Sequence, residues 1–192
     1  MIPADALEAL GPLLDALAAL GIPYHVGGSV ASSIWGPPRT TRDADVVIAL
    51  TSAQVPALLP LLTPHYYVDP ATFTQAVRQR GTVNLIHFDL SYKVDVFVLG
   101  QAPFHQAALA RAVPVPHPDA ARTVAVTSPE DIVVQKLAWY RAGQETSERQ
   151  WLDVRGVLQM QEATLDQAYM AAAATELGVG DLLAEAWATR WD

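Results

Sequence analysis

Hydrophobic residues recur along the chain at two spacings, one typical of helices and one typical of strands. Leucines spaced as on one helix face run through residues 4–20, and Gly21-Ile22-Pro23 ends that pattern. Short apolar stretches rich in β-branched residues predict strands at residues 24–26, 43–50, 82–88, 93–99 and 124–126. Capping residues and apolar spacing predict helices at residues 30–35, 52–62, 70–80 and 103–112. Thr51 or Ser52 is the expected cap of the second of these helices.

After residue 127 the pattern becomes helical throughout. Ser128-Pro129-Glu130-Asp131 combines a cap residue, a first-turn proline and acidic residues, and Ser147-Glu148-Arg149-Gln150 is a capping box. Helices are predicted at residues 128–141, 148–160, 165–177 and 181–190. We therefore expect an α/β core in residues 1–127 and a C-terminal helical region, residues 128–192, packed on it.

Composition narrows the classes of function. The chain has 192 residues, enough for one domain or for a compact core with a small appended subdomain. It has no cysteine, so any metal must be bound by oxygen or imidazole ligands. The net charge of -8 disfavours a protein that coats nucleic acid, although it leaves room for a local basic cleft. The chain lacks a basic signal sequence and an apolar stretch of ~18 residues, which predicts a cytoplasmic protein without a membrane segment.

Three aspartates stand in predicted strands. Asp43 and Asp45 are spaced i, i+2, so they project to one side of their strand, and Asp95 shares a strand face with Lys93 and Phe97. The pair could also be a solvated strand start, and Asp95 could pair with Lys93 or an arginine. Carboxylates that converge from two strands repel one another unless a cation neutralises them. We therefore expect a divalent cation at Asp43, Asp45 and Asp95, with Asp95 placed to act as a base.

A glycine turn precedes the carboxylates. Gly27-Gly28-Ser29 stands at the start of a predicted helix, where backbone N–H groups and a hydroxyl can bind phosphate oxygens. Phosphate and metal would then be bound side by side. Two magnesium ions could bridge the nucleotide phosphates and an attacking hydroxyl in an in-line phosphoryl attack.

These residues together resemble a known signature. Gly27-Gly28-Ser29, then Arg39-Thr40-Thr41-Arg42-Asp43-Ala44-Asp45 and Lys93-Val94-Asp95, resemble the motifs of the DNA polymerase β-like nucleotidyltransferase superfamily. The likeness is greatest to its minimal and abortive-infection (AbiEii-type) toxin-like branches. Ser128-Pro129-Glu130-Asp131 with Lys136, and Arg149 with Asp153, resemble the helical motif that follows the catalytic sheet there. The thirteen residues between Ser29 and Asp43 form a longer spacer than in the best-known members, and Ala44 is smaller than the usual residue.

The resemblance implies a fold, a site and an activity. The fold is a nucleotidyltransferase core with a mixed β-sheet flanked by helices. The implied metal ligands and catalytic residues are Asp43, Asp45 and Asp95. The implied nucleotide-binding residues are Gly27, Gly28, Ser29, Arg39, Arg42 and Lys136. The implied cofactor is Mg²⁺, as two ions, with Mn²⁺ as the substitute.

The expected reaction transfers NMP from an NTP to a hydroxyl acceptor on RNA, such as tRNA, or on protein. The branch implies a toxin-antitoxin component with a cognate antitoxin as partner. Two alternatives stay open. One is an aminoglycoside-type nucleotidyltransferase that modifies a small molecule, and the other is a non-catalytic homologue that binds NTP or a partner protein.

Several of these residues have simpler interpretations. Lys136 could belong to a solvated helix face, and Arg39 and Arg42 could pair with the carboxylates. Asp153 is expected to be a structural partner of a cation such as Arg149, at i, i+4. Three tryptophans in the predicted C-terminal helices are expected in the core rather than as platforms for a base; they are Trp139, Trp151 and Trp187.

Overall fold

The computed structural model describes residues 2–117 and 123–190. The strands of these residues form one mixed sheet of seven strands in the order β3-β4-β5-β2-β1-β7-β6. Their bounds are β1 (Tyr24–Val26), β2 (Asp43–Ile48), β3 (Tyr66–Tyr67), β4 (Thr82–His87), β5 (Lys93–Val98), β6 (Val113–Pro116) and β7 (Thr123–Val126). The pairs β2–β5 and β1–β7 are parallel, and the other neighbours are antiparallel. The predicted α/β fold with a mixed sheet flanked by helices is confirmed.

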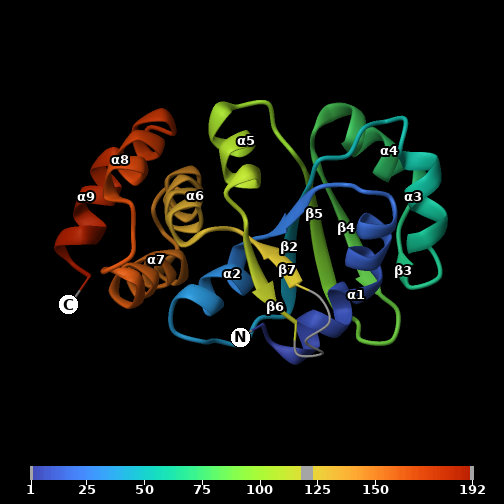
Figure 1. Cartoon of the computed structure of the whole chain (residues 1–192), viewed down its shortest axis with the longest axis horizontal. Helices are drawn as coiled ribbons and strands as arrows, with labels where there is room; N and C mark the ends of the chain where they lie inside the picture. Colours follow the sequence, from blue (N-terminus) through green and yellow to red (C-terminus); the bar gives the residue numbers. More distant parts are fainter. Residues whose placement is uncertain (1, 118–122, 191–192) are drawn as a thin grey trace.

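Helices cover the sheet and extend beyond one end of it. Their bounds are α1 (Ala4–Ala19), α2 (Gly28–Trp35), α3 (Val55–Leu62), α4 (Pro70–Gln79), α5 (Pro103–Ala110), α6 (Pro129–Ala142), α7 (Glu148–Gln161), α8 (Gln167–Glu176) and α9 (Gly180–Ala188). In Figure 1, α1, α3 and α4 lie at the β3-β4-β5 end, whereas α6 to α9 gather at the opposite end. The short helix α2 packs against both α6 and α7, and so joins the helical group to the sheet.

The two central strands, β2 and β5, have one buried apolar face and one polar face. Buried and half-buried residues alternate along both strands, as the period-2 pattern predicts. The buried face joins the leucines of α1 in the core; its residues are Ala44, Val46, Ile48, Val94, Val96 and Val98. The opposite face carries the polar residues of both strands, so the same two strands support the core and the candidate site.

Strand β3 is fastened to α1 through a tyrosine hydroxyl. Helix α1 contains Pro12, which has no N–H and disturbs the helical hydrogen-bond ladder. At the next residue, the buried Tyr66 hydroxyl accepts a hydrogen bond from the Leu13 N–H (3.1 Å) and donates one to the Ala9 carbonyl (2.7 Å). The hydroxyl therefore inserts into one step of the ladder and satisfies both groups.

The structure differs from the prediction mainly at short elements. The strands β3 and β6 were not predicted, because β3 has two residues and β6 alternates valine with proline. Proline is tolerated in β6 because this strand lies at the edge of the sheet. The helix α3 begins at Val55 rather than directly after Thr51 or Ser52, since the Thr51 hydroxyl donates to Gln54 Oε1 (2.8 Å) across a turn. None of the helices in the described ranges is both long and apolar enough to span a bilayer.

Candidate active site

The three candidate carboxylates lie on one face of the paired strands β2 and β5. Parallel pairing sets Asp45 directly opposite Asp95, and Asp43 opposite Lys93. Because side chains two residues apart share a face, Asp43 projects beside Asp45 toward the same side. The sheet therefore brings the three aspartates together from two strands, as the strand pattern predicts. Their role as metal ligands stays a prediction.

The surroundings of Asp45 oppose its ionisation. Burial, then the negative charges of Asp43 and Asp95, raise the pKa of Asp45 to about 6. Lys93 Nζ lies 2.7 Å from Asp95 Oδ2, which is the pairing left open from the sequence. Within the described part of the chain, the buried Asp95 Oδ1 has no hydrogen-bond partner. Thr41 donates to Asp43 Oδ1 (2.6 Å). The negative charges of the three aspartates are thus only partly balanced by nearby cations and hydrogen-bond donors.

The carboxylates offer suitable donor chemistry for a hard cation. Three aspartates supply oxygen ligands of the kind that Mg²⁺ and Mn²⁺ prefer, and the unpartnered Asp95 oxygen is free to bind one. In residues 2–117 and 123–190, however, no group of three or more His, Asp or Glu side chains is already arranged to hold a metal ion. The Lys93 ammonium now neutralises Asp95. Metal binding by all three carboxylates therefore requires these side chains to move, although Asp95 Oδ1 is available to a cation while Lys93 stays at Oδ2.

The glycine turn is built against Asp45. The Gly27 N–H donates to the Asp45 carbonyl (2.8 Å), which fixes the turn onto β2. Gly28, the first residue of α2, has φ +55°, and a Cβ at this position would lie 1.6 Å from Asp45 Oδ2. Glycine is required here for its backbone conformation and for the space that the carboxylate occupies. The backbone at the N-terminus of α2 therefore lies directly against the Asp45 carboxylate.

A buried ion-pair network borders the carboxylates. Arg39 donates to Ser29 Oγ (2.5 Å) and to both Asp153 oxygens (2.9 Å each), and Lys136 Nζ lies 2.8 Å from Asp153 Oδ2. Asp153 is a structural partner of cations, as expected, but they are Arg39 and Lys136 from other segments rather than Arg149, because α2, α6 and α7 pack together. The solvated interpretation of Lys136 is wrong, since it is only 1% exposed. Burial lowers the pKa of Lys136, and Asp153 opposes that change.

Most of the predicted residues line one cleft of about 450 Å³ between the sheet and α6–α7. They are Gly28, Ser29, Arg39, Asp43, Asp45 and Lys136. Arg42 instead lines an adjoining hollow of about 570 Å³, which shares Thr41, Asp43 and Arg149 with the cleft. Gly27 lies in the turn behind the cleft. Asp95 stands beside Asp45 on the neighbouring strand.

Sequence reasoning missed two aromatic residues of the cleft. Trp139 was expected in the core, but it lines the cleft together with Phe97. Trp139 follows Lys136 by three residues on α6, so the two share a helix face. Phe97 follows Asp95 by two residues on β5 and therefore shares its strand face. These spacings are the signals by which both residues could have been found.

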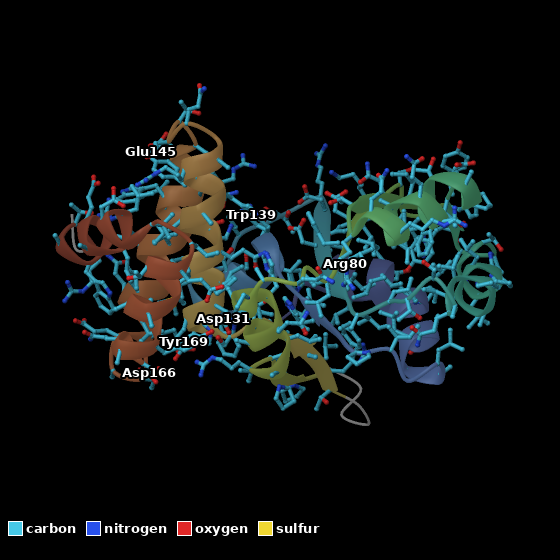
Figure 2. All side chains as sticks on the ribbon, turned by 90° about the horizontal axis from the view of Figure 1, so that it is seen from above. Arg80, Asp131, Trp139, Glu145, Asp166 and Tyr169 are labelled. Atoms are coloured by element: carbon cyan, nitrogen blue, oxygen red, sulfur yellow. The ribbon has the colours of Figure 1, made fainter. Side chains whose placement is uncertain are left out.

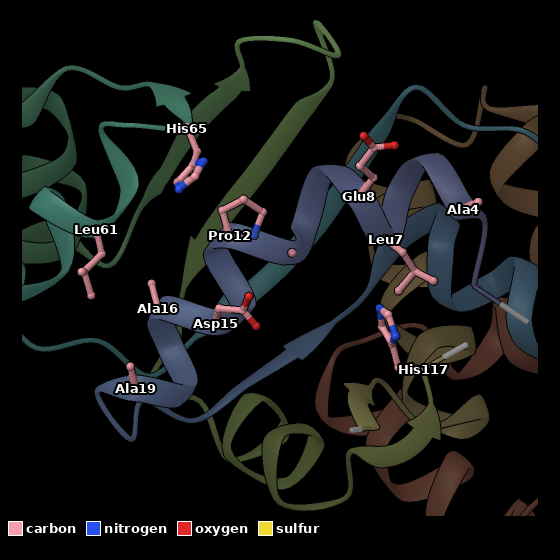
Figure 3. A pocket seen from close by; sticks show the side chains of 11 residues that line it. Ala4, Leu7, Glu8, Pro12, Asp15, Ala16, Ala19, Leu61, His65 and His117 are labelled. Carbon is pink, nitrogen blue, oxygen red and sulfur yellow. The ribbon is translucent and has the colours of Figure 1, made fainter. Parts of the chain in front are cut away.

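A larger hollow, of about 680 Å³, lies along α1 and shares no residue with the cleft. Figure 3 shows Leu61 and His65 on one side of α1 and His117 on the other. It has no glycine turn and no carboxylates paired across strands. The cleft lined by Asp43 and Asp45, with Asp95 next to Asp45 on the neighbouring strand, is therefore the candidate active site.

No protein family model and no curated protein sequence matches the chain. Several solved structures do match its fold. A nucleotidyltransferase-like protein from Paracoccidioides brasiliensis has a TM-score of 0.55 at 19% identity, over 96% of this chain and 93% of that one. A Thermotoga maritima protein, provisionally described as a nucleotidyltransferase, has a TM-score of 0.54 at 15% identity, over 80% of this chain and 96% of that one. The antibiotic-resistance factor ANT(2″)-Ia, in complex with adenylyl-2″-tobramycin, has a TM-score of 0.52 at 13% identity, over 90% of this chain and 97% of that one. This chain therefore has the fold of the nucleotidyltransferases.

Proposed function

We propose that the protein is a metal-dependent nucleotidyltransferase that transfers NMP from an NTP to a hydroxyl group. One observation carries the proposal: Asp45 lies opposite Asp95, with Asp43 beside it, directly against the turn at Gly28. A turn that can bind phosphate next to incompletely neutralised carboxylates suits a metal-bound nucleotide. The nucleotidyltransferase fold supports the same assignment.

Each part of the cleft would have a distinct task. The N–H groups at the start of α2 would bind phosphate oxygens, and Lys136 and Arg39 would neutralise the triphosphate. Magnesium held by the aspartates would supply charge neutralisation and Lewis acidity. Asp95, once released from Lys93, would accept the proton of the acceptor hydroxyl. The hydroxyl oxygen then bonds to the α-phosphorus of the NTP, the bond to the β-phosphate oxygen breaks, and pyrophosphate leaves.

The hollow beside Asp43 offers two arginines to an anionic acceptor. Its lining consists of Asp5, Thr40, Thr41, Arg42, Asp43 and Arg149, and neither arginine forms an ion pair with another described residue. The hollow meets the cleft at Asp43, so an acceptor there could reach the α-phosphate from the side away from Gly28 and Lys136. In-line displacement needs that approach. Of the expected acceptors, RNA carries phosphates that both arginines could bind.

A small-molecule acceptor is the second candidate. It is favoured by the fold likeness to ANT(2″)-Ia, whose structure was solved with adenylyl-2″-tobramycin. A polycationic acceptor in the hollow would face Arg42 and Arg149 as well as Asp5 and Asp43. The toxin-antitoxin role and the antitoxin partner rest on the sequence resemblance alone and stay predictions.

Labelling from NTPs tests the proposal. The protein would be incubated with each α-³²P NTP, Mg²⁺ or Mn²⁺, and total RNA, cell protein or aminoglycosides. We expect labelled RNA from the wild type and background labelling from Asp43→Asn. Asp89→Asn, in the exposed turn between β4 and β5, is the matched control and should label at the wild-type rate. Labelling by Asp43→Asn at the wild-type rate would exclude the assignment, and a labelled aminoglycoside would favour the second candidate.

A further inference from the structure

The cleft contains a stacked pair of aromatic rings next to its charged residues. Phe97 on β5 and Trp139 on α6 have ring centroids 6.2 Å apart and ring planes inclined by 29°. Both line the cleft that contains Asp43, Asp45 and Lys136. Figure 2 labels Trp139, on the side of α6 that faces the sheet. An aromatic pair thus joins the sheet to the helical region at the candidate active site.

Trp139 differs in its surroundings from the other described tryptophans of the C-terminal helices. Trp151 and Trp187 pack against the hydrophobic core, and Trp151 lies 5.3 Å from the ring of Tyr140. Trp139 is half-buried and packs on Phe97 within a cleft otherwise lined mainly by polar and charged residues. Apolar aromatic surface that remains open to such a cleft suits a flat, aromatic ligand.

We propose that Trp139 and Phe97 form the site that binds the nucleobase of the NTP, an inference that rests on the proposed function. The same elements supply both ends of the nucleotide site. Lys136 lies one helix turn before Trp139, and Asp95 lies two residues before Phe97 on the strand. With the triphosphate at Gly28 and Lys136, the base reaches the aromatic pair and stacks on it.

The strength of stacking on a tryptophan depends on the area of the base more than on the hydrogen-bonding groups at its edge. A purine covers more of the indole than a pyrimidine does. The site therefore takes ATP and GTP in preference to CTP and UTP, and the preference is modest because every base has a face that can stack. This inference names the substrate class that the carboxylates alone leave open.

Calorimetry with two ligands tests the site without measuring transfer. Wild type, Trp139→Ala, Trp139→Phe and Phe97→Leu would be titrated with ATP and with tripolyphosphate, both with Mg²⁺. We expect Trp139→Ala to weaken ATP binding by about 10- to 100-fold and to leave tripolyphosphate binding unchanged. Trp139→Phe should restore most of the ATP affinity, and Phe97→Leu should lie between wild type and Trp139→Ala.

A matched control comes from the neighbouring helix. Trp151→Phe alters a tryptophan that packs on the core and should leave both affinities at the wild-type value. The nucleobase site is overturned if Trp139→Ala binds ATP as wild type does, if it loses both ligands equally, or if wild type binds no NTP. A wild type that shows the expected ATP pattern but releases no pyrophosphate with any acceptor would overturn the proposed transfer and leave the nucleobase site standing.

Discussion

Two buried acidic groups in this protein have opposite surroundings. At the start of α6, Asp131 accepts hydrogen bonds from the Tyr169 hydroxyl (2.5 Å) and the Ser128 hydroxyl (2.7 Å), and Arg111 Nε lies 3.4 Å away (Figure 2). Asp45, in the cleft, faces other carboxylates. Burial raises the pKa of both aspartates, but hydrogen bonds and Arg111 oppose the rise at Asp131, whereas carboxylates add to it at Asp45.

The difference separates a carboxylate that holds the fold together from one to which the proposed function assigns a cation. Arg111 also pairs with Glu130 (3.1 Å) and lies over the Tyr169 ring, so the Asp131 group ties α5, α6 and α8 to one another. No comparable set of donors surrounds Asp45, and its neighbour Asp95 keeps one oxygen without a partner among the described residues. Such an arrangement fits the cation site of the proposed function.

Removing the compensated carboxylate should cost the most stability. Asp131→Ala removes the carboxylate that accepts from Ser128, the cap of α6, and from Tyr169, and it leaves Arg111 with Glu130 alone, so we expect the free energy of unfolding to fall by about 3 to 5 kcal/mol. Urea denaturation measures this. Asp181→Ala, which removes an exposed partner of Arg141, is the control and should leave stability nearly unchanged. Equal effects of the two variants would remove the contrast.

The buried His25 should give the next largest change in the free energy of unfolding. Burial, then His105, lower the pKa of His25 to about 4, and its Nδ1 lies 2.6 Å from Thr127 Oγ1. Since the unfolded chain binds a proton near pH 6.5, this group contributes stability above that pH and loses it on acidification. Between pH 7 and pH 4 we expect a loss on the order of 3 kcal/mol from His25. Chemical denaturation of wild type and His25→Gln across this range should show a shallower loss in the variant; parallel curves would contradict the prediction.

Neutralising the uncompensated carboxylate should stabilise the metal-free protein. The raised pKa of Asp45 means that its favourable contribution is present below the unfolded value and lost as pH rises through about 6. At pH 7.5 the ionised group therefore destabilises the fold, and Asp45→Asn should gain about 1 to 3 kcal/mol without metal. Melting temperatures with and without Mg²⁺ measure this. Mg²⁺ should raise the melting temperature of wild type and leave that of the variant unchanged, and a variant less stable than wild type would contradict us.

The Tyr66 hydroxyl should give the smallest effect. Tyr66→Phe removes the group inserted between the Leu13 N–H and the Ala9 carbonyl. Because these two groups are i and i−4 partners, they can bond to each other once the hydroxyl is gone. We expect a loss of about 1 kcal/mol, measured by urea denaturation. A loss as large as that of Asp131→Ala would show that α1 cannot close this gap.

The sequence was most informative where one residue pattern had one structural meaning. Alternation in β2 and β5 placed Asp43, Asp45 and Asp95 on one face, because strand side chains alternate strictly. The caps at Ser128 and Ser147 marked the starts of α6 and α7, since a side-chain oxygen there accepts a backbone N–H.

Contacts between segments far apart in the chain were harder to predict from the sequence. Asp153 was assigned to the nearest cation along its helix, whereas the fold pairs it with Arg39 and Lys136. Trp139 was assigned to the core because a helical stripe does not reveal which neighbour covers it. Both depend on how α2, α6 and α7 pack, which one-dimensional spacing does not encode.

The bare backbone at Gly28 has a consequence for judging other chains with this fold. A methyl group there and the Asp45 carboxylate would compete for one volume. A chain could therefore keep every acidic residue of the motif, carry alanine at the equivalent position, and be inactive. Inspecting the aspartates alone would misclassify it as an enzyme, whereas the glycine identifies the chains in which the motif can assemble.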